Sequence, residues 1–76
     1  MKIILDRAKV QRFAAVRNET LTGLARNASL DYAHLHRLMR NDCEPSARLR
    51  RRICERWGAT FDDLFTIVEE ATEVAV

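Results

Sequence analysis

The chain has 76 residues, of which 47% are hydrophobic and 32% are charged. This length suffices for one domain, and the apolar content is too high for a disordered chain. No apolar run approaches the ~20 residues that a membrane helix needs. The chain contains only two glycines and one proline, which favours helices. We therefore expect a soluble cytoplasmic protein, from a bacterium or a phage-infected cell, that has no membrane partner.

The positive charge is confined to one part of the chain. Residues 1–57 hold all 13 basic residues and six acidic ones, which gives a net charge of +7. Residues 58–76 hold five acidic residues and no basic one, which gives −5. A basic body of this kind is typical of a protein that binds a polyanion, and the acidic end should lie away from that partner.

Capping residues and helical spacing predict five short helices. They cover residues 7–17 after Asp6, 21–28 after Thr20, 32–40 after Asp31, 47–57 after Ser46, and 61–70 after Thr60. Pro45 prevents the third helix from continuing, and Gly58 supplies the left-handed residue that stops the fourth. No strand pattern is found. The predicted fold class is all-α, a compact five-helix bundle in one domain over residues 1–70 with a tail at 71–76.

Each predicted helix is too short to be stable alone, so all five must share one core. On the first helix, Val10, Phe13, Ala14 and Val16 follow the spacing of an inward face. The core expected across the five helices is built around Phe13, Leu24, Leu35, Leu38, Leu49, Ile53, Trp57, Phe61 and Leu64. Phe65 is predicted to be a core residue as well.

Residues that could support catalysis or bind a metal are sparse. Cys43 and Cys54 come without a secretory signal and are predicted to be free thiols. His34 and His36 point about 200° apart on a helix and cannot chelate one ion together. The chain has no glycine-rich phosphate loop and no nucleophile partnered with a histidine. We expect no enzymatic activity, no metal, no cofactor and no small-molecule ligand.

The segment Thr20–Arg40 is the most informative part of the sequence. Two predicted helices are separated there only by residues 29–31. Helices joined so tightly cross steeply, and the second one projects a solvent-facing side that fits a major groove. This is the helix-turn-helix arrangement.

Three stretches resemble the Cro/repressor-type (XRE-like) helix-turn-helix family. They are TLTGLA at residues 20–25, SLDYAHLHRL at 29–38, and a run from Pro45 that ends in WGATFDDLF at 57–65. The resemblance covers residues 6–65 and implies that Leu30 and Leu35 are the buried anchors of the turn and of the recognition helix. Some positions depart from the family pattern. Ser29 stands where glycine is usual, Leu21 where glutamine is usual, and Asp42 and Glu44 where the loop often carries basic residues.

The resemblance also implies which side chains contact DNA. Base edges would be read by Tyr32, Ala33, His36 and Arg37, with the Arg37 guanidinium forked onto guanine. Phosphate contacts are expected from Thr20, His34, Arg40, Ser46 and Arg48. The alternative for Arg37 is a surface arginine paired with Asp31 or Glu44.

The function that the resemblance implies is sequence-specific binding of double-stranded DNA by a transcription regulator. A small phage or prophage Cro-like repressor, which represses by occupying its operator, fits best. Only 11 residues follow Phe65, so we expect no regulatory domain after the DNA-binding domain. The alternative is an interaction protein, the antitoxin of a toxin–antitoxin pair, whose tail at residues 66–76 wraps its partner.

A homodimer is expected at least on DNA, because one recognition helix covers too few base pairs to single out a genomic site. The apolar residues Val68, Val74 and Val76 suggest that the C-terminal tails pair across a two-fold axis. They would do so as an extended fifth helix or as a short two-stranded ribbon. The alternative is a monomer that dimerises only on its operator.

Overall fold

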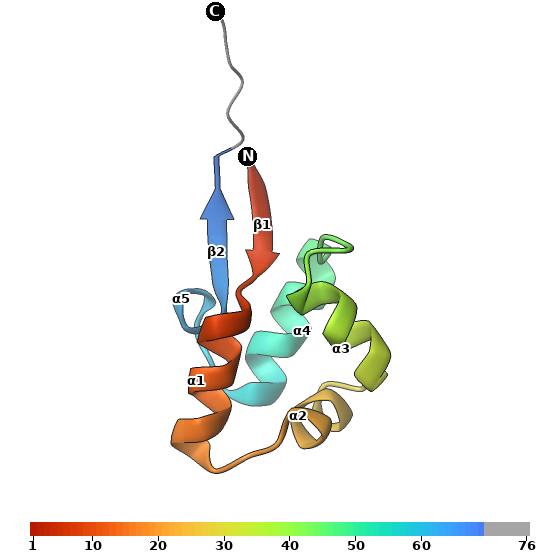
Figure 1. Cartoon of the computed structure of the whole chain (residues 1–76), viewed down its shortest axis with the longest axis vertical. Coiled ribbons are helices and arrows are strands. Elements are labelled where there is room, and N and C mark those ends of the chain that lie inside the picture. The colour runs from red at the N-terminus through yellow and green to blue at the C-terminus, as the bar shows by residue number, and fades with distance from the viewer. Residues whose placement is uncertain (70–76) are drawn as a thin grey trace, which may run out of the picture.

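A computed structural model describes residues 1–69 of the chain. A short strand precedes five helices, and a second short strand follows them (Figure 1). The elements are β1 (Lys2–Leu5), α1 (Arg7–Arg17), α2 (Leu21–Asn27), α3 (Tyr32–Met39), α4 (Ala47–Trp57), α5 (Phe61–Leu64) and β2 (Phe65–Val68). The two strands rise together from the helical body, with α1 and α5 on one side and α3 and α4 on the other (Figure 1).

The prediction of an all-α fold is wrong, because β1 and β2 form a two-stranded antiparallel sheet. Lys2 pairs with Val68 at one end of the sheet, and Leu5 pairs with Phe65 at the other. Each strand has only four residues, too few to show a clear alternation of apolar and polar positions. The fold is therefore a mainly helical domain in which the two ends of the described chain are joined by strand pairing.

The expected fifth helix over residues 61–70 is also wrong beyond its first turn. Helix α5 ends at Leu64, and the residues Phe65–Val68 enter β2. Aromatic and β-branched side chains such as those of Phe65, Thr66, Ile67 and Val68 favour extended backbone. The pairing with β1, whose residues lie 60 to 66 positions before their partners, decides between the two conformations.

The other helices begin where the capping residues predict. The Asp6 carboxylate accepts from Ala8 N–H at 3.0 Å, and the Ser46 hydroxyl oxygen accepts from Leu49 N–H at 3.1 Å. Asp31 holds the N-cap position of α3, but its side chain makes no capping hydrogen bond. Gly58 ends α4 at a φ of 66°, in the left-handed region as predicted. Helix α4 has the predicted bounds, and α2 and α3 are each one residue shorter than predicted.

The core is centred on Trp57, whose Nε1–H donates to the carbonyl oxygen of Leu24 at 2.8 Å. Six predicted core residues are buried: Leu24, Leu35, Leu38, Ile53, Trp57 and Leu64. Phe13, Leu49 and Phe61 are only partly buried against them, and Val16 is 73% exposed, contrary to the predicted inward face. Phe65, which the sequence also predicts to be a core residue, is fully buried by the sheet, and so is Leu5, which was not among the predicted core residues.

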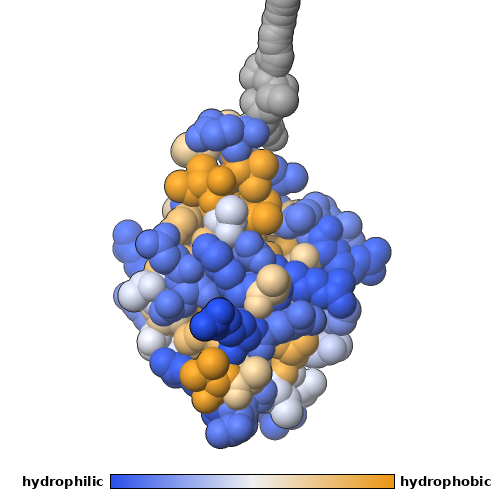
Figure 2. All heavy atoms as spheres, turned by 60° about the vertical axis from the view of Figure 1, so that its left-hand side comes forward, coloured by the Kyte–Doolittle hydropathy of each residue, from blue (hydrophilic) through white to orange (hydrophobic). Residues whose placement is uncertain are grey.

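Some apolar residues remain on the surface near the sheet. Figure 2 shows them as an orange patch just below the grey C-terminal trace. Large exposed hydrophobic residues there are Met1, Ile67 and Val68. The predicted pairing of Val74 and Val76, like the whole tail at 71–76, lies outside the described residues. No helix among residues 1–69 is long and apolar enough to cross a membrane.

Candidate nucleic-acid interface

Helices α2 and α3 are joined by the short connection that the sequence predicts. The chain turns through Ser29, whose φ of 59° lies in the left-handed region. The N–H of Ser29 donates to the carbonyl of Arg26 at 3.1 Å, and that of Leu30 donates to the carbonyl of Ala25 at 2.8 Å. A positive φ explains why glycine suits this position, and serine adopts it here at a steric cost. The side chain of Leu30 is buried, as expected for an anchor of the turn.

Helix α3 has one buried side and one exposed side. Leu35, Leu38 and Met39 are buried in the core. The opposite side carries the exposed residues Ala33 and Arg37, and the helix is followed by the exposed Arg40. Ala33, Arg37 and Arg40, which are expected to contact DNA, are therefore accessible.

The two histidines of α3 lie on different flanks of its exposed side. The His36 ring meets the Tyr32 ring edge-on, with 5.1 Å between the centroids. Tyr32 is exposed and His36 is half-buried, so the pair forms one flank. His34 is also half-buried and lies about 200° around the helix from His36. Only His36 therefore shares a flank with Tyr32.

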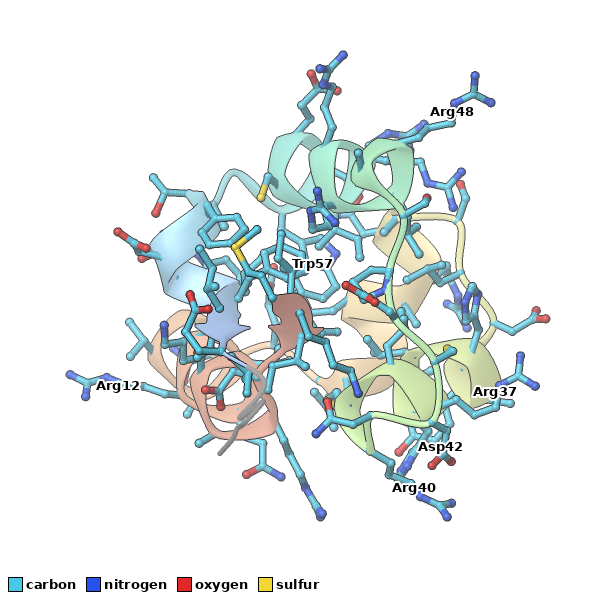
Figure 3. All side chains as sticks on the ribbon, turned by 90° about the horizontal axis from the view of Figure 1, so that it is seen from above. Arg12, Arg37, Arg40, Asp42, Arg48 and Trp57 are labelled. Atoms are coloured by element: carbon cyan, nitrogen blue, oxygen red, sulfur yellow. The ribbon has the colours of Figure 1, made fainter. Side chains whose placement is uncertain are left out.

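Three arginines extend from the side of the molecule formed by α3 and the start of α4. Figure 3 shows Arg37, Arg40 and Arg48 pointing outward there, whereas Arg12 of α1 points outward on the opposite side. All four are exposed. Three arginines that are predicted to contact DNA thus extend from one side of the molecule. Arg12, an exposed arginine on the opposite side, can serve as a control for them.

The loop after α3 contains the only ion pair formed among residues 1–69. Arg40 Nε lies 3.6 Å from the Asp42 carboxylate, and the backbone N–H of Asp42 donates to the Arg37 carbonyl at 2.9 Å. Arg37 is not paired with Asp31 or Glu44 in this part of the chain, so the alternative for Arg37 receives no support. Glu44 instead accepts the backbone N–H of Ile3 at 3.1 Å.

Two predicted phosphate contacts are the capping residues of α2 and α4. The hydroxyl oxygen of Thr20 accepts from Gly23 N–H at 3.0 Å, and that of Ser46 accepts from Leu49 N–H. A hydroxyl group whose oxygen accepts a hydrogen bond at a helix N-cap can still donate its own proton. Both side chains are exposed, so both can donate to an anion.

Other arginines stabilise the fold through hydrogen bonds that were not predicted from the sequence. Arg17 donates to the carbonyl oxygen of Trp57 at 2.8 Å and lies over the Phe13 ring at 4.4 Å. Arg56 donates to the Asn27 carbonyl at 3.2 Å, and the Asn27 amide donates back to the Arg56 carbonyl at 3.0 Å. The hydrogen-bonded partners lie 29 to 40 positions apart, so no local sequence pattern could have identified these bonds.

The described residues show no arrangement suited to metal binding. No group of three or more His, Cys, Asp or Glu side chains within residues 1–69 could hold a metal ion. Cys43 and Cys54 are both free thiols. Burial raises the pKa of the Cys54 thiol, which disfavours the reactive thiolate.

Comparison with known proteins gives no match to a family model, to a curated protein or to a solved structure. The helix-turn-helix interpretation therefore rests on the residues and the geometry of α2, α3 and α4.

Proposed function

We propose that this protein is a transcription regulator that binds double-stranded DNA sequence-specifically with α3 in the major groove. The observation that carries the proposal is the accessible side of α3, where Ala33 and Arg37 lie between the Tyr32–His36 pair and His34. A major groove accepts one α-helix, and the exposed side chains of that helix then face the base edges. The buried side of α3 holds the helix on the body.

Arg37 is the best candidate for direct base recognition. It is exposed and makes no ion pair within residues 1–69, so binding DNA breaks no internal bond of its guanidinium. An arginine binds the O6 and N7 atoms of guanine with two hydrogen bonds. The methyl group of Ala33 suits a thymine methyl, and the Tyr32–His36 pair adds polar groups at the flank.

Residues around α3 supply the contacts to the phosphate backbone. Arg48 and Ser46 stand at the start of α4, Thr20 caps α2, and Arg40 follows α3. Contacts of this kind position a protein on the duplex without reading its sequence. His34, on the second flank of α3, is the remaining proposed phosphate contact.

The proposed biological role is that of a small Cro-like repressor, of phage or prophage origin, that acts in the cytoplasm as a homodimer by occupying its operator. The antitoxin alternative depended on a tail at residues 66–76 that wraps a partner. Its first residues, Thr66–Val68, belong to β2 and pair with β1 of the same chain. This pairing gives no support to a tail that wraps a partner.

The decisive experiment selects bound duplexes from a random DNA library and then compares two arginine variants on the selected site. Arg37→Ala should weaken specific binding by roughly 1–3 kcal/mol and relax the preference at one base pair. Arg12→Ala removes the same side chain from the opposite side of the molecule and should leave affinity and preference unchanged.

Two results would count against the proposal. A selection that returns no enriched sequence argues against specific recognition. Equal losses for Arg37→Ala and Arg12→Ala would mean that the bound DNA senses only net charge and that α3 does not read bases.

A further inference from the structure

A groove of about 470 Å³ lies between α1 and α5, on the side of the molecule away from α3 (Figure 1). Helix α5 contributes two acidic residues to its lining, Asp62 and Asp63. Helix α1 contributes residues that recur at helical spacing along one stripe: Lys9, Arg12, Phe13, Val16 and Arg17. Figure 2 shows this side of the molecule, where hydrophobic side chains lie among hydrophilic ones.

Most of the charged groups in the groove already have partners within the chain. Lys9, Arg17 and Asp63 are hydrogen-bonded to backbone groups of other residues, at distances of 2.8 to 3.0 Å. Arg12 and Asp62 are exposed and make no ion pair within residues 1–69. The groove therefore offers one free cation on its α1 side and one free anion on its α5 side.

The same groove exposes apolar surface. Val16 is 73% exposed, and Phe13 is only partly buried against the core. An arginine beside such surface can cover it with its aliphatic stem while its guanidinium binds a carboxylate, which makes arginine common in protein interfaces. Exposed apolar surface between free charges of both signs therefore suits a contact with another protein surface.

We propose that this groove binds the same groove of a second copy of the chain, with a two-fold axis that runs along the groove between α1 and α5. Such an axis sets the α1 side of each copy against the α5 side of the other. Arg12 and Asp62 line the same short groove, so the long Arg12 side chain of one copy reaches Asp62 of the other. Each exposed Val16 side chain is then covered by the other copy.

The charges favour a second copy over an unrelated protein. A two-fold interface requires each group and its partner to lie on the same surface of one chain, so that the contact forms twice. Arg12 and Asp62 meet this requirement, because they have opposite charges on opposite sides of one groove. A two-fold axis across α1 would instead set the α1 sides of both copies against each other, with like charges facing. The charges thus select the axis along the groove.

This contact leaves the proposed DNA-binding side of both copies free. Arg12 points away from the side that carries Arg37, Arg40 and Arg48 (Figure 3), so two copies joined through the groove present their α3 helices in opposite directions. Helices that face opposite ways cannot both enter the major groove of one operator. We therefore expect the pair to bridge two duplexes. The bridging rests on the proposed function, whereas the contact itself does not.

Amide chemical shifts of the isotope-labelled full chain without DNA, followed from micromolar to millimolar concentration, test the contact. The shifts that change should belong to residues of the groove. Arg12→Glu sets a carboxylate against Asp62 of the other copy and should weaken the association by roughly tenfold or more. Arg7→Glu makes the same change in charge at an exposed position on the opposite side of α1 and should associate as the wild type does. Circular dichroism checks that both variants keep the helical fold.

A mixing experiment tests the ion pair between the copies. Asp62→Lys, like Arg12→Glu, should associate weakly alone, because its new ammonium group faces Arg12 of the other copy. An equimolar mixture of the two variants should associate again, because both facing pairs are then opposite in charge. Recovery on mixing supports the two-fold contact, and failure to recover overturns the pairing of Arg12 with Asp62.

Capture of a fluorescent duplex by a bead-bound duplex, both carrying the selected site, tests the bridging. The wild type should retain the fluorescent duplex on the beads. Arg12→Glu should lower the captured amount by roughly tenfold or more, although it binds a single duplex as tightly as Arg7→Glu does. Equal capture by both variants would show that the groove has no part in bridging.

The failure of this proposal and the failure of the proposed function are distinguishable. Groove shifts that do not change with concentration overturn the contact, even where the chain binds its selected duplex or dimerises through another surface. Shift changes without capture of a second duplex, in a chain that binds its selected site, overturn the bridging. Shift changes in a chain that selects no DNA sequence overturn only the proposed function.

Discussion

The Glu44 carboxylate accepts the backbone N–H of Ile3 at 3.1 Å and ties the loop before α4 to the N-terminal strand. Without this bond, the outward N–H of Ile3 would have only solvent as a partner. From the sequence alone, the acidic side chain of Glu44 would repel phosphate and so disfavours a phosphate contact from this loop. The structure gives the same carboxylate a role in holding β1 beside the loop and close to α3.

Replacement of Glu44 should therefore affect stability. Glu44→Ala removes the acceptor and should lower the free energy of unfolding by about 0.5–1.5 kcal/mol. Glu44→Gln keeps an acceptor oxygen at the same distance along the side chain and should lower the free energy of unfolding by less than Glu44→Ala does. Urea denaturation followed by circular dichroism measures both variants. If the urea midpoint of Glu44→Ala equals that of the wild type, the hydrogen bond to Ile3 makes no net contribution to the free energy of unfolding.

Asp42 should limit DNA affinity, because its carboxylate competes with phosphate for Arg40. An exposed ion pair of this kind is worth about 0.2–1 kcal/mol, so Asp42→Asn should tighten binding by about 1.4- to 5-fold. The matched control is Asp62→Asn, which removes an equal charge from α5, on the other side of the molecule. Equal gains for both variants in a fluorescence-anisotropy titration would assign the effect to net charge alone.

Binding should weaken steeply with salt. About four to six phosphate contacts per chain correspond to a slope of about −4 or steeper in a plot of log affinity against log salt concentration. Arg48→Ala, which removes one proposed phosphate contact, should make that slope shallower by about one and weaken all sequences alike. A flat response of the wild type to salt would contradict nucleic-acid binding as its main activity.

Acid should weaken the hydrogen bond between Thr66 of β2 and Asp6, the N-cap residue of α1. Asp6 accepts the Thr66 hydroxyl at 2.8 Å and the N–H groups of Ala8 and Lys9, and these bonds, the Thr66 hydroxyl first, lower its pKa from the ordinary value of 3.8. A carboxyl whose pKa is lower in the folded state stabilises the fold fully above its unfolded pKa. That contribution is lost as the pH falls below 3.8 and through the folded-state pKa.

The variant Thr66→Val tests this link. It should be less stable than the wild type at neutral pH, and the difference in unfolding free energy should shrink as the pH falls below 3.8. Thr22→Val, at an exposed position on α2, controls for the general effect of exchanging threonine for valine. A difference for Thr66→Val that does not change with pH would show that ionisation of Asp6 is not involved.

The sequence by itself determined the first four helices and the start of the fifth, because their signals are local. A capping side chain acts on N–H groups two or three residues away, as Asp6, Thr20 and Ser46 do. The left-handed stop at Gly58 and the buried spacing of Leu35 and Leu38 are also contained within a few residues. The outward positions of α3 followed from the same spacing, and the family resemblance then implied which of them would contact bases.

Only the tertiary structure decided what depends on partners far apart in the chain. Residues 65–68 are compatible with a helix or a strand, and pairing with residues 2–5 selects the strand. The same pairing buries Leu5, which was not among the predicted core residues. Arg17 bonds Trp57, and Glu44 bonds Ile3, each across about 40 positions. Such contacts arise only when folding brings distant segments together, so a short window of sequence holds no signal for them.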